Sequence, residues 1–190
     1  MGTVKYRAGV RELFRRSPVV TVRDVATIVG SREYARLLLS TMARKGEIWR
    51  VTKGFYTTSE DPTVSVFCFR PAYIGLQDAL SIRNLWEQET TTVIVTTQKV
   101  KKSMIRVFGS NVIVHRIQPA YMFGSEMVRQ GGMYVPVSDV EKTLIDLVYF
   151  NEVPEQQVMH ALKKQASRET LRRYLHAYPQ PFRKRVLAFC

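Results

Sequence analysis

Two amphipathic helical patterns separated by a two-residue joint constrain the fold of this chain most strongly. Apolar residues recur at positions i, i+3, i+4 and i+7 in two successive segments. The first set is Val22, Val25, Ala26 and Val29, and the second is Ala35, Leu38, Leu39 and Met42. Only Gly30 and Ser31 provide the joint: glycine suits the end of one helix, and serine suits the N-cap of the next. A joint this short predicts a helix-turn-helix.

Another helical pattern precedes this pair. It consists of three apolar residues on one face: Val10, Leu13 and Phe14. We expect this first helix to end at Ser17-Pro18, because proline cannot continue a helix. Thr21, followed three residues later by Asp24, predicts a capping box at the start of the second helix.

A short β-hairpin is predicted directly after the third helix, which we expect to end at Gly46. Residues 48–51 and 55–58 are rich in strand-forming side chains. Thr52-Lys53-Gly54 between them suits a short turn. Three helices followed by a hairpin are typical of a winged helix-turn-helix, which we predict over residues 1–60, with the hairpin as its wing.

The outward face of the third helix and the wing supply candidate DNA contacts. At about 100° per residue, Arg36 and Ser40 lie opposite the apolar stripe. An arginine can form two hydrogen bonds to guanine, and Arg32 lies in the first turn, where the helix dipole also favours phosphate. The candidate DNA-binding residues are Thr21, Arg23, Arg32, Arg36, Ser40, Arg44, Arg50 and Lys53.

Other readings of this face stay open. A charged outer helix face can simply be solvated, and a trihelical unit with a hairpin can also dock protein. Leu37 on the same face could touch a thymine methyl group, or could pack against the wing or a second subunit.

The distribution of charge indicates polyanionic partners. The net charge is +13, with +7 in residues 1–60, +1 in residues 61–150 and +5 in residues 151–190. Nucleic acid is the commonest polyanion of the cytoplasm, so two basic ends around a near-neutral middle favour a nucleic-acid-binding protein. The alternatives are a membrane surface or basic faces without a partner.

Residues 61–150 read as a small mixed α/β domain. Strands are predicted at 90–98, 104–108, 112–117 and 133–137, and a helix at about 76–85. Ser138-Asp139-Val140-Glu141 predicts a capping box for a further helix. The expected fold is therefore α+β: an N-terminal winged helix-turn-helix, this α/β domain and C-terminal helices.

Residues 151–190 form a basic region with helical patterns. Its cations are candidate contacts to phosphate or to an acidic partner: Lys163, Lys164, Arg168, Arg172 and Arg173. Solvated side chains on an outer helix face are an equal alternative.

The sequence offers little chemistry. His115, His160 and His176 have no second ligand at metal-binding spacing, and no nucleophile or nucleotide-loop motif is present. We therefore expect no enzyme, no metal and no cofactor. No apolar run approaches the roughly 18 residues that cross a bilayer, and the N-terminus lacks a signal-peptide pattern. A cytoplasmic protein without a membrane partner is the expectation.

The order of several segments resembles a known family. "GEIWRVTKGFY", "PAYIGLQDAL", "VIVTTQKV", "VIVHRI" and "VPVSDVEKTLIDLVYF" together resemble the AbiEi-type antitoxins and their archaeal relatives, over about residues 10–150. The last segment matches the family pattern at Glu141, Lys142, Leu144, Ile145 and Asp146. Val140 departs from it, because the family commonly has proline there.

The resemblance implies a DNA-binding regulator that represses its own operon and neutralises a nucleotidyltransferase-like toxin, with antitoxicity in the C-terminal region. It assigns DNA contact to Arg32, Arg36, Ser40, Arg44 and Lys53. The expected function is a sequence-specific, double-stranded-DNA-binding transcriptional regulator acting as a homodimer. The alternative is an antitoxin that works mainly by contact with the toxin protein, with DNA binding secondary.

Overall fold

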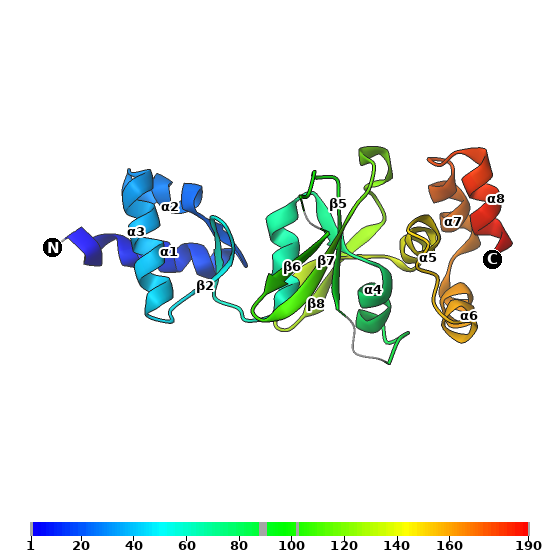
Figure 1. The fold of residues 1–190 in the computed structure, drawn as a ribbon, viewed down its shortest axis with the longest axis horizontal. Coiled ribbons are helices and arrows are strands. Elements are labelled where there is room, and N and C mark those ends of the chain that lie inside the picture. Colours follow the sequence, from blue (N-terminus) through cyan, green and yellow to red (C-terminus); the bar gives the residue numbers. More distant parts are fainter. Residues whose placement is uncertain (1, 88–90, 102, 190) are drawn as a thin grey trace. The chain divides into compact units, whose positions relative to one another are not determined.

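The chain forms two compact units in a computed structural model that describes residues 2–87, 91–101 and 103–189 (Figure 1). Unit 1 comprises Met1–Cys68 with Val107–Gly109, and unit 2 comprises Phe69–Arg106 with Ser110–Cys190. The α+β fold expected from the sequence is confirmed, with N-terminal helices and a hairpin followed by a mixed domain and C-terminal helices.

Unit 1 contains the three helices and the hairpin in the predicted order, together with a two-residue strand and a 3-10 helix that were not predicted. Its elements are α1 (Gly2–Arg16), β1 (Val20–Thr21), α2 (Val22–Val29), α3 (Arg32–Arg44), β2 (Trp49–Thr52), β3 (Phe55–Thr57) and the 3-10 helix η1 (Pro62–Phe69). Within the described residues, the strands make a three-stranded sheet in the order β1-β3-β2, and both pairings are antiparallel. The two-residue strand β1, absent from the sequence prediction, ties the segment between α1 and α2 to the hairpin through Val20 opposite Tyr56.

Local capping sets the helix boundaries of unit 1. The backbone N–H of Thr21 donates to the Asp24 carboxylate at 2.7 Å, and the Asp24 N–H donates to the Thr21 hydroxyl at 3.2 Å, which completes the predicted capping box. Gly30 ends α2 with a φ of 77°, a left-handed conformation that glycine adopts without steric cost. The Ser31 hydroxyl then accepts the N–H of Tyr34 and caps α3.

One apolar cluster holds the helices of unit 1 to the hairpin. The buried members are Val10, Phe14, Val20, Val25, Ala35, Leu38, Leu39, Met42, Ile48 and Tyr56. Both predicted stripes contribute to this cluster, so α2 and α3 each turn one face inward. Each fully buried aliphatic side chain stabilises the unit by about 1.5–3 kcal/mol.

Unit 2 is built on a mixed sheet. Its strands are β4 (Ala72–Ile74), β5 (Thr92–Thr96), β6 (Met104–Val107), β7 (Ser110–Arg116), β8 (Ser125–Gln130) and β9 (Met133–Ser138). In the part of the chain that is described, these six strands run in the order β6-β7-β5-β4-β9-β8. The β5–β7 and β4–β9 pairs are parallel, whereas β4–β5 and β8–β9 are antiparallel. Every residue of β5 is buried, as expected for a central strand covered on both faces.

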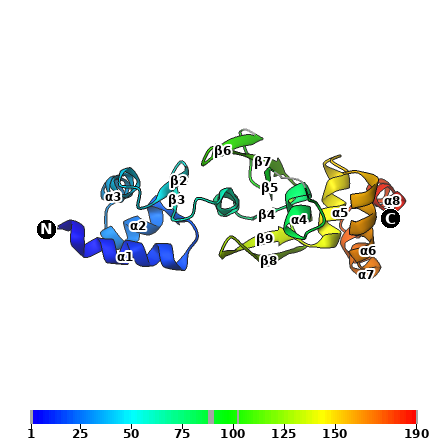
Figure 2. The same cartoon turned by 90° about the horizontal axis from the view of Figure 1, so that it is seen from below.

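The helices of unit 2 cluster at one end of it (Figure 2). They are α4 (Leu76–Ile82), α5 (Val140–Tyr149), α6 (Gln156–Gln165), α7 (Arg168–Leu175) and α8 (Gln180–Ala188), together with the 3-10 helix η2 (Pro119–Tyr121). Met159, Leu162, Leu171 and Val186 of the C-terminal helices share one core with α4, α5 and the sheet. Residues 151–190 thus belong to unit 2 and do not form the separate region expected from the sequence.

Several local predictions for unit 2 need correction. Strands β4 and β8 were not expected. The strand predicted at 90–98 spans Thr92–Thr96, and its first predicted residue, Thr90, lies outside the described residues. Asp139, not Ser138, caps α5 by accepting the N–H of Lys142, while the Ser138 hydroxyl bonds to that of Thr143.

A buried polar cluster lies at the centre of unit 2. Lys142 and Asp146, one turn apart on α5, are both fully buried and form an ion pair. The Tyr73 hydroxyl donates to Asp146 at 2.6 Å, and the Lys142 ammonium donates to the Tyr178 hydroxyl at 3.1 Å. The Lys142 nitrogen also lies 5.3 Å from the ring centre of Phe123. The cluster therefore joins β4, α5 and the segment after α7.

Burial acts against the charge on both members of this pair. It lowers the pKa of Lys142 and raises the pKa of Asp146, and in each case the partner's charge opposes the shift. Each partner's charge therefore favours the charged form of the other. These two residues belong to the last segment quoted for the family resemblance, so that segment has a structural role at the core of unit 2.

We predict that Asp146→Asn destabilises the protein by about 3–5 kcal/mol, because it leaves Lys142 buried without a counter-charge. The double change Lys142→Met with Asp146→Leu should cost less than Asp146→Asn, since no buried charge remains. Urea denaturation followed by circular dichroism measures both. Glu12→Gln is the control: Glu12 pairs with the exposed Arg16 on α1, and its loss should cost at most about 1 kcal/mol. An equal cost for Asp146→Asn and Glu12→Gln would contradict this account.

Candidate nucleic-acid interface

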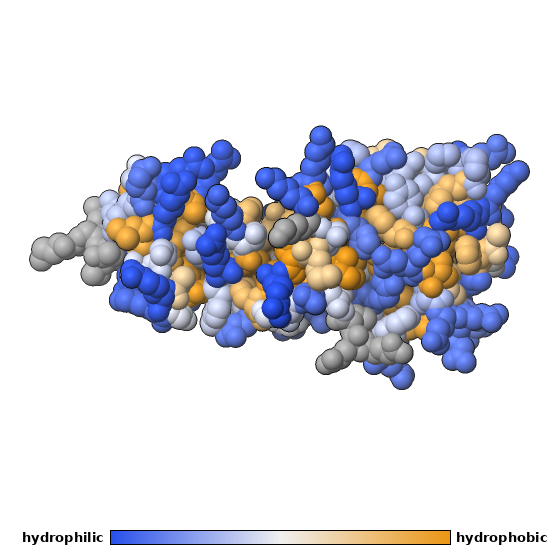
Figure 3. Space-filling model, viewed as in Figure 1, coloured by the Kyte–Doolittle hydropathy of each residue, from blue (hydrophilic) through white to orange (hydrophobic). Residues whose placement is uncertain are grey.

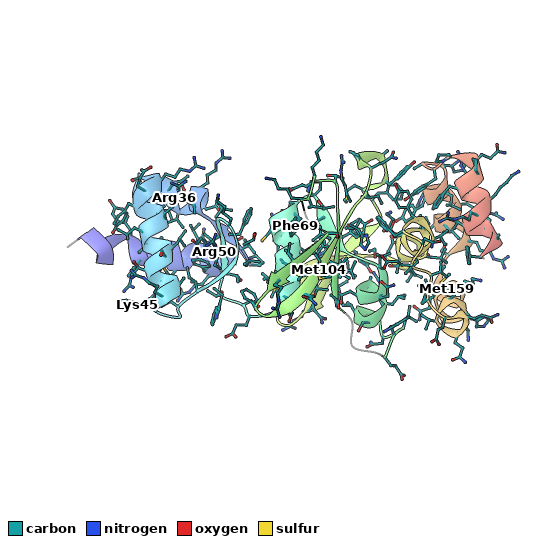
Figure 4. All side chains as sticks on the ribbon, in the orientation of Figure 1. Arg36, Lys45, Arg50, Phe69, Met104 and Met159 are labelled. Carbon is teal, nitrogen blue, oxygen red and sulfur yellow. The ribbon has the colours of Figure 1, made fainter. Side chains whose placement is uncertain are left out.

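Helix α3 turns a polar, basic face to solvent. Ala35, Leu38, Leu39 and Met42 are buried, whereas the predicted contacts Arg32, Arg36, Ser40 and Arg44 are all exposed. Hydrophilic side chains predominate over α3 and the adjoining hairpin in Figure 3. Figure 4 shows Arg36 on α3 and Arg50 on the hairpin. The helix therefore combines a firmly packed side with a side that is free to meet a ligand.

The hairpin adds a second cationic element. Lys53 is exposed in the turn between β2 and β3. Arg50 is also exposed, and its Nε donates to the carbonyl of Thr52 at 3.4 Å, so the side chain lies along the hairpin. The pairing register of β2 with β3 shifts between Arg50 and Thr52, so the ladder is irregular at this point of the strand.

The start of α2 carries the remaining two predicted contacts. Arg23 is exposed in the first turn. Thr21 is half-buried, and its hydroxyl donates to Asp24 at 2.8 Å while it accepts the Asp24 N–H. The Thr21 side chain is thus engaged in the capping box, so any phosphate contact by its hydroxyl would compete with the cap.

The same face of α3 holds two further groups that bear on recognition. Glu33 is exposed beside Arg32 and Arg36, and its pKa is lowered by a backbone hydrogen bond and by the Ser31 hydroxyl. A carboxylate here opposes phosphate but can accept from the amino group of cytosine. Leu37 is 60% exposed, so most of its side chain is open to solvent.

Two arginines of α1 form ion pairs with the loop that follows α3. Arg7 and Arg11 both pair with Glu47, at 3.0 and 3.4 Å, in the loop between α3 and β2. Sequence reasoning missed these pairs because the partners stand 40 and 36 residues apart. They connect α1 to the start of the hairpin that carries Lys53.

The predicted C-terminal contacts lie on α6 and α7 of unit 2. Lys164, Arg168, Arg172 and Arg173 are exposed and Lys163 is half-buried. Arg173 lies over the ring of Tyr174, at 5.7 Å from the ring centre. These cations form a set of their own on unit 2 and are treated separately from the α3 face.

No metal centre is evident in the described residues, where no group of three or more His, Cys, Asp or Glu side chains is close enough to hold an ion. His115 instead contacts Glu152 at 3.0 Å and packs on Phe150. Over the same residues, the structure contains no helix of sufficient length and apolar character to span a bilayer.

Comparison with known proteins finds a family that matches most of unit 1. Residues 10–58, which run from α1 to just past the hairpin, match a family described as "Transcriptional regulator, AbiEi antitoxin". Over these residues the chain is similar to the AbiEi antitoxin regulators. The family resemblance drawn from the sequence is confirmed over these residues, and it supports a DNA-binding role of the antitoxin type.

A solved structure matches nearly the whole chain. The crystal structure of the RV2827C protein from Mycobacterium tuberculosis superposes with a TM-score of 0.61 and 15% sequence identity, covering 97% of this chain and 76% of that one. At this identity the likeness concerns the fold alone. No curated protein matches the sequence. The description of the AbiEi family names transcriptional regulation and antitoxin activity. That this protein is not an enzyme stays a prediction.

Ser31, the N-cap of α3, and Ser40, on the exposed face of that helix, provide a test of what stabilises the start of α3. Ser31→Ala removes the N-cap and should destabilise α3 by about 0.5–2 kcal/mol. Ser40→Ala, on the exposed face, should change stability by no more than about 0.5 kcal/mol. Hydrogen–deuterium exchange of the α3 amides reports both changes. Faster exchange in Ser40→Ala than in Ser31→Ala would contradict the role of Ser31.

Proposed function

We propose that the protein is a sequence-specific, double-stranded-DNA-binding transcriptional regulator that represses its own operon. The observation that carries the proposal is the exposed basic face of α3 opposite a buried apolar stripe, next to the exposed Lys53 of the wing. The match of this same region to AbiEi antitoxin regulators supports it.

The proposed binding mode assigns roles by chemistry. Helix α3 enters the major groove, where Arg36 hydrogen-bonds guanine and Ser40 contacts a base edge. Contacts to phosphate fix the position of the helix without reading sequence. These come from the ends of α3, the start of α2 and the wing: Thr21, Arg23, Arg32, Arg44, Arg50 and Lys53.

A homodimer is part of the proposal. One winged helix reads a short half-site, and two copies related by twofold symmetry read a palindrome with half-sites about one helical turn apart. Light scattering of the full chain, free and with a footprinted site, measures the stoichiometry. A monomer in both states would remove the dimer from this account.

The second candidate function rests on the description of the matched family as antitoxins. In that case a nucleotidyltransferase-like toxin is the principal partner and DNA binding is secondary. Co-expression with the product of the adjacent open reading frame, followed by size-exclusion chromatography and a growth-rescue assay, distinguishes the two. Rescue that survives loss of DNA binding would favour the antitoxin function.

Arg36→Ala and Lys53→Ala should weaken DNA binding in different ways. Arg36→Ala should cost about 1–3 kcal/mol on the specific site and much less on random duplex, because it removes a base contact. Lys53→Ala should weaken both duplexes alike and reduce the salt slope, log K against log salt, by about one unit, because it removes a phosphate contact. Fluorescence anisotropy at two salt concentrations measures both effects.

Arg15→Ala is the matched control, since Arg15 is an exposed cation of α1 outside the candidate interface. It should alter neither specificity nor the salt slope. If Arg36→Ala and Lys53→Ala weaken specific and random DNA equally, α3 does not read bases. The protein would then be a non-specific DNA-binding protein, and the regulator proposal would fail.

A further inference from the structure

A pocket in unit 2 lies among α5, α6 and α7. Its volume is about 310 Å³, at the lower end of the range for small-molecule sites. Leu144 of α5 and Leu171 of α7, both buried in the core, supply apolar walls. The remaining lining residues come from α6 and the start of α7: His160, Lys163, Lys164, Ala166 and Arg168.

The cations of this pocket are not neutralised by the protein. Across the described stretches of the chain, Lys163, Lys164 and Arg168 take part in no ion pair, whereas Arg83 and Lys142 of unit 2 do. Glu141, one turn before Leu144 on α5, accepts the backbone N–H of Ser167. Glu169, next to Arg168 in sequence, is not part of the lining. Three like charges around one hollow favour the binding of an anion.

The frame around the pocket is held in place by specific contacts. The Tyr174 hydroxyl donates to Asp139 at 2.6 Å, which fastens α7 to the start of α5. Ser167 caps α7 by accepting the N–H of Thr170. Leu162 anchors α6 in the core, where it is fully buried. A site on packed helices is preorganised, so little ordering of the backbone opposes binding.

We propose that this pocket binds a small phosphate monoester with an apolar body, such as a mononucleotide. Lys163, Lys164 and Arg168 hold the dianionic phosphate, because charge-assisted hydrogen bonds from lysine and arginine suit its oxygens. The apolar part of the ligand lies against Leu144 and Leu171. Unit 2 is then a ligand-binding unit in its own right, independent of the DNA contacts of unit 1.

The lining also separates this site from a general basic surface. Arg172 and Arg173 are exposed on the same helix as Arg168, yet neither lines the pocket. A DNA duplex would contact Arg168, Arg172 and Arg173 over a broad face. A ligand in the pocket contacts Arg168 but neither of the other two arginines. Arg168 and Arg172 carry the same charge, lie on the same helix and are both exposed, but of the two only Arg168 lines the pocket.

Isothermal titration calorimetry of the full chain at fixed ionic strength tests the proposal. We expect saturable, one-to-one binding of adenosine monophosphate, weaker binding of inorganic phosphate, and at least tenfold weaker binding of adenosine, which lacks the phosphate. Arg168→Gln should reduce the affinity for adenosine monophosphate at least tenfold. The matched control Arg172→Gln should change it less than twofold, and circular dichroism confirms that both variants are folded.

Three results would overturn the proposal. The first is no binding of either adenosine monophosphate or inorganic phosphate. The second is an equal loss of affinity in Arg168→Gln and Arg172→Gln, which would indicate a diffuse basic surface. The third is displacement of adenosine monophosphate by duplex DNA without terminal phosphates at a matched phosphate concentration, which would assign the pocket to a nucleic-acid backbone. The first two measurements contain no DNA, so they do not depend on the DNA-binding function of unit 1.

Discussion

The packing of the α3 stripe into the core of unit 1 determines which side chains of that helix face outward. Ala35 and Leu39 are fully inaccessible and Leu38 and Met42 nearly so, and together they fix the rotation of α3 about its axis. A rotation that exposed this stripe would forfeit several kcal/mol of apolar burial. The cap at Ser31 and the turn at Gly30 fix where the helix begins. The orientation of the basic face is therefore a consequence of core packing. The same packing holds the side chains of the proposed DNA contact in place.

Unit 2 depends on a different kind of interaction. Its centre is the Lys142–Asp146 pair, and the hydroxyl groups of Tyr73 and Tyr178 are further hydrogen-bond partners of these two residues. Breaking such a pair from one side is costly because the remaining charge stays buried. The cluster orients α5 relative to the sheet, and α5 supplies one wall of the cationic pocket through Leu144. Stability and the proposed ligand site thus share one helix.

The sequence predicted unit 1 well because its signals are local. Helical periodicity, the Thr21–Asp24 capping box and the Gly30-Ser31 joint all operate within a few residues, and each is present in the structure. Strand β1 was not predicted, because its two residues are too few to show a periodic pattern. The same holds for β4, which has three residues. In β8 the sequence SEMVRQ lacks the apolar alternation of a half-buried strand.

Long-range polar contacts were beyond the reach of sequence reasoning. Tyr73 meets Asp146 across 73 positions, and Arg7 meets Glu47 across 40. Lysine is almost never fully buried, so only the family resemblance singled out Lys142, and it gave no reason for that residue. The pocket among α5, α6 and α7 likewise arises from tertiary packing, although three of its cations, Lys163, Lys164 and Arg168, were already candidates by composition.

Chemical protection of DNA tests the central claim most directly, namely that α3 reads bases in the major groove. Dimethyl sulfate methylates the N7 of guanine, which lies in the major groove, and the N3 of adenine, which lies in the minor groove. The duplex to probe is the region upstream of the protein's own gene. The account predicts protection of guanine N7 at positions about one helical turn apart. Binding that leaves every guanine N7 accessible would contradict it.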